Sequence, residues 1–204
     1  LHKAIRRQRQ MCIRDRCGVE LFVLDDGWFG QRNDDHAGLG DWVANPERLP
    51  NGIKGLSERI EAMGIKFGLW FEPEMTNKDS DLYRAHPDWI LHTPGRNASH
   101  GRYQYVLDFS RKEVVEYIYE MMAKILSEAK VSYIKWDMNR SITECYSVAL
   151  PADRQGEVFH RYILGVYDLY ERLTSEFPEV LFESCSSGCL LYTSPSPRDL
   201  STSR

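Results

Sequence analysis

Short apolar segments that each run into polar residues recur along this chain and alternate with segments of helical periodicity. Branched and aromatic residues typical of buried strands fill four of them. They are Glu20 to Leu24, Ile65 to Phe71, Val131 to Trp136 and Val180 to Phe182. Strands that alternate with helices through short connections favour a parallel sheet. The sequence therefore predicts an α/β fold.

Apolar residues at helical spacing predict helices over Asn51 to Met63, Ser110 to Ala129 and Glu157 to Phe177. Ser110 and Glu113 have the spacing of a capping box, which predicts that the second helix begins there. We expect a further extended segment over Gly101 to Phe109. It would place Arg102 just before a short apolar stretch.

Polar residues follow each predicted strand at its carboxyl end. Asp25 and Asp26 follow the first strand, and Asp137 follows the third. In a barrel of parallel strands this end carries the chemistry. Lys135 and Asp137 are two residues apart, so on a strand both side chains point into one shared space. A structural ion pair at the strand end would explain the same pattern.

Four ordered motifs resemble those of the bacterial α-galactosidases of glycoside hydrolase family 36. They are Leu24 to Gly30, Gly68 to Met75, Lys135 to Arg140 and Glu183 to Ser186, and the match runs from about Val19 to Gly188. The resemblance implies part of a catalytic (β/α)₈ barrel, a TIM barrel, with about four β/α units. It also implies removal of terminal α-linked galactose from sugars such as melibiose and raffinose, with retention of anomeric configuration.

The resemblance assigns roles to individual residues. Asp137 matches the family's nucleophile, and a retaining enzyme needs a second carboxyl group to protonate the leaving oxygen. The residues that match sugar-binding positions are Asp25, Asp26, Trp70, Arg102, Lys135, Asn139, Cys185 and Gly188. No metal or cofactor is expected.

Simpler interpretations compete with several of these roles. Trp70 packs in a core in many proteins, Cys185 could be an inert buried thiol, and adjacent aspartates often mark a solvated turn. Carboxylates near the same strand ends are expected to be structural hydrogen-bond acceptors; they are Glu72, Glu74, Asp108 and Glu183. Residues 33–36 suggest a metal site by composition only.

Three regions follow from the match: a ragged segment at 1–18, part of it non-native; a partial barrel at 19–188; and a disordered, non-native tail at 189–204. The family's general acid lies beyond its Glu-Ser-Cys-Ser motif, so no residue here is assigned that role. We expect the isolated chain to be marginally stable and inactive, because an open half-barrel leaves sheet edges unpaired.

Composition limits the partners. The net charge of −4, from 26 basic and 30 acidic residues, argues against nucleic acid. No apolar run is long enough to span a membrane. Five cysteines without metal-like pairing favour a reducing compartment, here the bacterial cytoplasm. The family resemblance also implies a homotetramer for the full-length parent. Alternatives remain a related α-N-acetylgalactosaminidase, a raffinose-synthase-like transferase, or an inactive carbohydrate-binding remnant.

Overall fold

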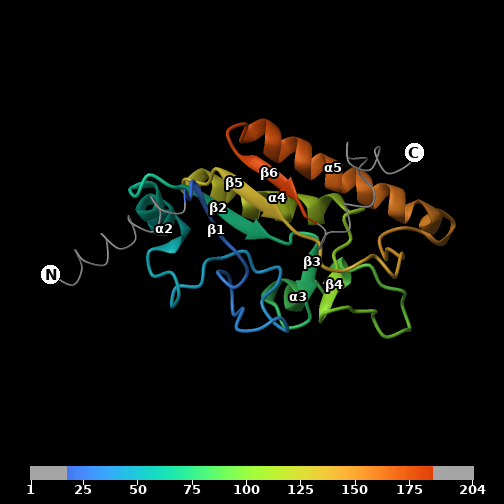
Figure 1. Ribbon diagram of the computed structural model, residues 1–204. Coiled ribbons are helices and arrows are strands. Elements are labelled where there is room, and N and C mark those ends of the chain that lie inside the picture. The colour runs from blue at the N-terminus through green and yellow to red at the C-terminus, as the bar shows by residue number, and fades with distance from the viewer. Residues whose placement is uncertain (1–17, 186–204) are drawn as a thin grey trace, which may run out of the picture.

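The computed structural model describes residues 18–185. The predictions for the segment before Gly18, for Gly188 and for the tail at 189–204 lie outside these residues. The described part is an α/β unit built on a parallel sheet (Figure 1). This agrees with the fold class that the sequence predicts.

The sheet has four parallel strands within the described residues. They are β1 (Leu21–Leu24), β2 (Lys66–Phe71), β5 (Tyr133–Trp136) and β6 (Leu181–Ser184), in the order β1-β2-β5-β6. The two middle strands, β2 and β5, have a neighbour on each side, and β2 is buried from Phe67 to Phe71. Its only small residue is Gly68, where an added Cβ would meet Tyr133 of β5 at 3.1 Å. The two middle strands therefore approach each other closely at this point.

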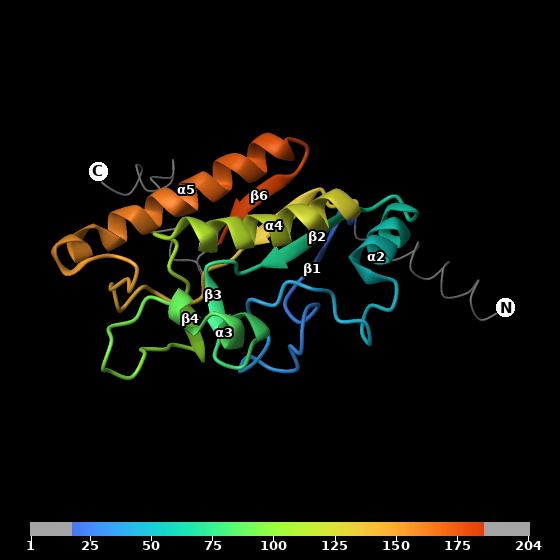
Figure 2. The same cartoon turned by 180° about the vertical axis from the view of Figure 1, so that it is seen from behind.

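Three long helices pack against one face of this sheet: α2 (Gly52–Glu61), α4 (Lys112–Glu128) and α5 (Val158–Glu176). The views from the front and from behind both show α4 and α5 running alongside each other over the sheet (Figures 1 and 2). Their buried residues recur at helical spacing, such as Val114, Ile118 and Met122 in α4. The helical periodicity of the sequence therefore locates the covered faces correctly.

The predicted capping box at the start of α4 is wrong. The residue preceding the helix is Arg111, and its side chain makes no capping hydrogen bond. The Ser110 hydroxyl donates instead to Oδ1 of Asp108 at 2.5 Å, and Arg111 Nε donates to Glu113 at 2.8 Å. Both bonds join residues only two apart, so other local hydrogen bonds to charged acceptors replace the capping box.

Residues 72–111 leave the sheet between β2 and α4 and form an excursion beside the carboxyl ends of the strands (Figure 1). Two short strands pair antiparallel within it, β3 (Met75–Asn77) and β4 (Gln104–Val106). The excursion also contains α3 (Asp81–Ala85) and a 3₁₀ turn at Pro87–Trp89, and a second 3₁₀ turn, Ala152–Glu157, precedes α5. Residues 101–109 are therefore not one extended strand.

The difference lies in a tight turn before β4. Arg102 and Tyr103 have positive φ angles of 51° and 60°. Backbone hydrogen bonds join Gly101 and Gln104 across the turn, and Asn77 Nδ2 donates to the Tyr103 carbonyl at 2.8 Å. Left-handed backbone at two successive residues without glycine gives no local sequence signal.

Aromatic residues from the loop after β1 form a cluster against β2. Trp28, Phe29 and Trp42 are nearly inaccessible to solvent. Phe29 stacks on Trp70 with ring centroids 6.1 Å apart, and Trp42 lies 5.0 Å from Phe71. This cluster fixes the path of the loop that carries Asp25 and Asp26.

Candidate active site at the carboxyl ends of the strands

The sheet register decides which side chains share the face opposite the helices. Trp136 stacks on Tyr170 of α5 at 4.2 Å, so it points toward the helices. Side chains alternate along a strand, so Lys135 and Asp137 point the other way. Trp70 pairs in register with Lys135 and lies on that same open face. The structure thus gathers three of the predicted site residues on one surface.

Asp137 is a buried carboxylate on this face, with 7% of its surface exposed. Its Oδ2 accepts hydrogen bonds from Trp70 Nε1 at 3.2 Å and from Asn139 Nδ2 at 2.7 Å. Its Oδ1 accepts the backbone N–H of Met138 at 2.9 Å. These donors orient the Asp137 carboxylate, which forms no ion pair with any residue in the described range 18–185.

Lys135 and Asp25 form an ion pair at 3.0 Å, with side chains 29% and 61% exposed. The hydrogen bond from Lys135 to Asp25 raises the pKa of the lysine above its usual value, against an opposing effect of burial. Burial raises the pKa of Asp25, but the Asp26 backbone N–H and Lys135 together outweigh it and leave this pKa lowered. Both groups are therefore charged at neutral pH and open to a ligand.

Asp26 is paired with Arg32, which is not among the predicted site residues. Arg32 donates to both carboxylate oxygens, from Nε at 2.9 Å and from Nη2 at 2.8 Å. The Arg32 side chain is 4% exposed, and its Nη1 also donates to Asn77 Oδ1 at 3.0 Å and to the Ala37 carbonyl at 3.1 Å. The pair lies six residues apart in an irregular loop, a spacing that carries no periodic signal.

Glu72 is a second buried carboxylate beside Asp137 and is inaccessible to solvent. Its Oε1 accepts the backbone N–H of Asn139 at 2.5 Å, and its Oε2 accepts Nε2 of Gln104 at 2.8 Å. Burial raises its pKa to about 7, helped by the charge of Asp137 and opposed by the hydrogen bonds from Asn139 and Gln104.

Other carboxylates near the strand ends are hydrogen-bond acceptors, as the sequence analysis expects. Glu74 accepts from Trp136 Nε1 at 3.0 Å and from the Tyr162 hydroxyl, and burial raises its pKa. Asp108 accepts from the Ser147 hydroxyl. Glu183, on edge strand β6, accepts from the Tyr133 hydroxyl, and burial and this carboxylate raise the pKa of Tyr133 to about 12.

The remaining predicted sugar-binding residues lie in different settings. Trp70 is 3% exposed, and its ring packs on Phe29 while its N–H faces Asp137. Arg102 is exposed in the left-handed turn before β4. Cys185 is half-buried directly after β6, and its backbone N–H donates to the Trp136 carbonyl at 2.7 Å. Gly188 lies beyond the described residues.

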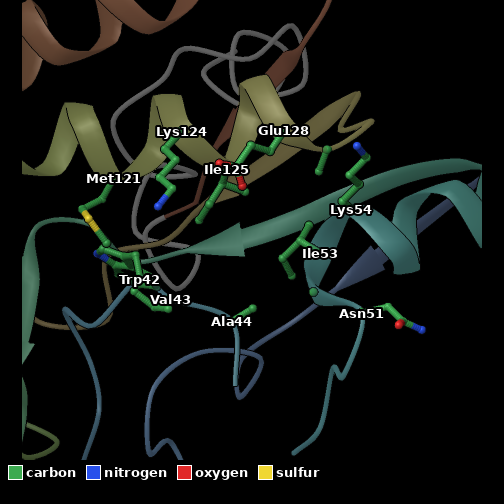
Figure 3. A pocket seen from close by; sticks show the side chains of 12 residues that line it. Trp42, Val43, Ala44, Asn51, Ile53, Lys54, Met121, Lys124, Ile125 and Glu128 are labelled. Carbon is green, nitrogen blue, oxygen red and sulfur yellow. The ribbon is translucent and has the colours of Figure 1, made fainter. Parts of the chain in front are cut away.

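A cavity of about 280 Å³ lies elsewhere, between α2 and α4 (Figure 3). Ile53 and Lys54 line it on one side, and Lys124, Ile125 and Glu128 line it on the other. None of the predicted sugar-binding residues lines it. Within residues 18–185 no group of three or more His, Cys, Asp or Glu side chains could hold a metal ion, and no helix there could cross a membrane.

Comparisons with known proteins identify the family of this chain. The family model described as Melibiase matches residues 9–192. The chain is 55% identical over 171 residues to the α-galactosidase AgaA of Geobacillus stearothermophilus, covering 84% of this chain and 24% of that protein. The chain belongs to the melibiase family. This is glycoside hydrolase family 36, to which its motifs point.

Two further comparisons support the assignment of this chain to the melibiase family. It is 53% identical over 173 residues to the α-galactosidase Mel36A of Lactobacillus acidophilus, with 85% of this chain and 24% of that protein covered. A crystal structure of a variant of AgaA in complex with raffinose matches with a TM-score of 0.83 at 51% identity, covering 88% of this chain and 26% of that chain. The chain spans about a quarter of the length of these relatives. Its four parallel strands correspond to part of their catalytic TIM barrel.

Proposed function

We propose that this chain forms the nucleophile-bearing part of a retaining α-galactosidase that acts on raffinose-type oligosaccharides. The observation that carries the proposal is the placement of Asp137, an enclosed carboxylate held by Trp70 and Asn139 on the same face as Lys135. Membership of the melibiase family and the raffinose complex of AgaA support the substrate class.

In the proposed reaction Asp137 attacks the anomeric carbon of galactose. The bond to the leaving oxygen breaks, and a general acid protonates that oxygen, which leaves galactose esterified to Asp137. Water then attacks the anomeric carbon as the bond to Asp137 breaks. The deprotonated general acid takes the proton of this water, and the sugar is released with its configuration retained. The general acid belongs, in this proposal, to the part of the relatives' length that this chain does not span.

Hydroxyl recognition falls to the exposed part of the face. Asp25 and Lys135 present a charged acceptor and a charged donor to solvent, and Asp26 keeps 39% of its side chain exposed beside buried Arg32. Charged groups of both kinds suit a sugar whose hydroxyls donate and accept hydrogen bonds, since a wrong epimer leaves them unpaired. Arg102, Cys185 and Gly188 complete the sugar-binding set in this proposal.

We further propose that the complete enzyme is a cytoplasmic bacterial homotetramer. The odd number of cysteines, five in the chain, supports the reducing compartment. The family resemblance supports the tetramer. Within the described residues, both cysteines are free thiols. Sedimentation of the complete enzyme tests the tetramer.

The test uses a graft, in which residues 18–185 replace the matching segment of AgaA. We expect the graft to release nitrophenol from p-nitrophenyl α-galactoside and not from the α-glucoside. Changing Asp137 to Gly should lower kcat by about a thousandfold or more, because the nucleophile is lost. Added azide should then restore turnover and give galactosyl azide of the β configuration.

Three outcomes would contradict the proposal. A folded graft that is inactive on both substrates would favour a carbohydrate-binding remnant. Full activity in the Asp137→Gly graft would remove Asp137 from the nucleophile's role. Activity on p-nitrophenyl N-acetyl-α-galactosaminide instead of the α-galactoside would favour the related α-N-acetylgalactosaminidase.

A further inference from the structure

Two carboxylates are joined through a single residue in the loop after β5. The backbone N–H of Asn139 donates to Glu72 Oε1 at 2.5 Å, and the side-chain amide of Asn139 donates to Asp137 Oδ2 at 2.7 Å. Glu72 follows β2, the strand that pairs with β5. The position of the Asn139 amide on Asp137 therefore depends on a carboxylate from the neighbouring strand.

The other end of Glu72 is also anchored. Its Oε2 accepts Nε2 of Gln104, and the Gln104 carbonyl in turn accepts Nη1 of Arg140 at 2.9 Å. Arg140 is 8% exposed and also donates to the Ser99 carbonyl at 2.8 Å. The loop after β5 is thus fastened at two successive residues, Asn139 and Arg140, to the excursion after β2.

We propose that Glu72 is a positioning residue for Asp137: its carboxylate holds the backbone of Asn139 so that the Asn139 amide keeps the nucleophile oriented. Glu72 has no exposed surface, and in this proposal it acts through Asn139 rather than by contact with the sugar. Naming Asp137 a nucleophile rests on the proposed function. The hydrogen-bonded link from Glu72 through Asn139 to Asp137 is independent of the proposed function.

Glu72 changes charge near neutral pH. Two charged residues of the loop after β5 lie near it: Asp137, and Arg140, which donates to the carbonyl of Gln104. Burial raises the pKa of Glu72 to about 7, and among these groups it is the charge of Asp137 that raises it further. An ionised carboxylate accepts a hydrogen bond more strongly than a neutral one. The ionised form therefore holds Asn139 more firmly.

Gln104 can satisfy both forms of Glu72. Its Nε2 donates to the ionised carboxylate, while its Oε1 is buried without a hydrogen-bond partner among the described residues. A half-turn of the amide would place Oε1 where it accepts the proton of neutral Glu72. A buried acceptor without a partner calls for such an explanation.

The coupling of the two carboxylates gives a test that needs no catalysis. In the graft, the carboxyl carbon of Glu72 is followed by ¹³C NMR as a function of pH, with and without Asp137→Asn. Removing the negative charge of Asp137 should lower the pKa of Glu72 by about one unit. An unchanged pKa in the Asp137→Asn graft would overturn the proposed coupling.

The positioning role is tested with Glu72→Gln, whose amide resembles the neutral carboxyl group. We expect kcat for p-nitrophenyl α-galactoside to fall about tenfold with KM nearly unchanged, because orientation in the transition state is lost rather than substrate binding. In the parent graft kcat/KM should rise as Glu72 ionises near neutral pH. This rise should disappear in the Glu72→Gln graft. A Glu72→Gln graft with the kcat and pH profile of the parent graft would overturn the role.

Glu74→Gln is the matched control. Glu74 is a buried carboxylate in the same segment, but it accepts from Trp136 and Tyr162 and has no link to Asn139. We expect this variant to lower the melting temperature while the pH profile stays in place. If the folded parent graft has no activity, the proposed function fails, and the NMR titration still decides the coupling of Glu72 to Asp137.

Discussion

The two middle strands and the two edge strands of the sheet present their polar residues differently. After β2 and β5, Glu72 and Asp137 are buried, and protein groups supply every donor described for them. After edge strand β1, Asp25 has 61% of its side chain exposed, and Glu183 on edge strand β6 is exposed as well. The middle of the site is organised by the protein itself, whereas its edges remain open to a ligand.

This difference has a simple physical cause. A middle strand has a neighbour on each side and helices over one face, so groups at its end are taken out of water and must find protein partners. An edge strand leaves its last residues hydrated, where an ion pair such as that of Lys135 and Asp25 is weak. Substitutions should therefore affect stability in the middle and ligand binding at the edge. All variants are compared in the graft of residues 18–185 into AgaA.

Arg32 should show the largest loss of stability, because this buried arginine supports the exposed edge from within. Arg32→Met would leave Asn77 and Ala37 with fewer donors and Asp26 without its partner. We expect the local free energy of unfolding to fall by about 3 kcal/mol. Hydrogen exchange of the backbone amides in β3 and in the loop after β1 measures it. Unchanged protection there would show that Asp26 is held by other contacts.

Glu72 should make stability depend on pH. Its pKa rises from 4.5 unfolded to about 7 folded, so the neutral form stabilises the fold. That contribution is complete below pH about 4.5 and is lost as the pH rises through about 7, an effect of about 3 kcal/mol. We expect Glu72→Gln to gain stability over the parent graft as the pH increases. Parallel melting temperatures from acid to alkaline pH would contradict this.

Trp70→Phe tests a single buried donor in the middle of the site. The change keeps an aromatic ring against Phe29 but removes the N–H that faces Asp137 at 3.2 Å. We expect a loss of about 1 kcal/mol in stability and a several-fold lower kcat. Thermal unfolding and steady-state kinetics of the variant measure both. A change in KM alone would instead identify Trp70 as a sugar-contacting wall.

Lys135→Met should cost the least stability. Lys135 lies on middle strand β5, but its ammonium pairs with Asp25 at the open edge of the sheet. The ion pair with Asp25 is open to water, so its removal should change the free energy of unfolding by less than about 1 kcal/mol. KM for the galactoside should nevertheless rise, because a charged donor to sugar hydroxyls is lost. A large fall in stability with unchanged KM would mean that the edge is organised internally as well.

The sequence predicted the parallel sheet and the helical faces because period and composition are local signals. It also placed Asp137 and Lys135 on one surface, since alternation along a strand follows from their spacing. It did not predict the β3–β4 pair, the left-handed turn at Arg102, or the bonds from Arg32 and Gln104. These depend on contacts between residues that are distant in the chain or lie in irregular loops.

The contact between α5 and the segment before α4 has a consequence for the interpretation of natural and engineered variants. At Gly165 an added Cβ would lie 2.0 Å from the carbonyl oxygen of Phe109, so any larger residue must push the helix away. In a survey of tolerated substitutions, Gly165 would be as invariant as Asp137. Yet it contributes no chemistry, and loss of activity in a Gly165 variant would report only the displacement of α5.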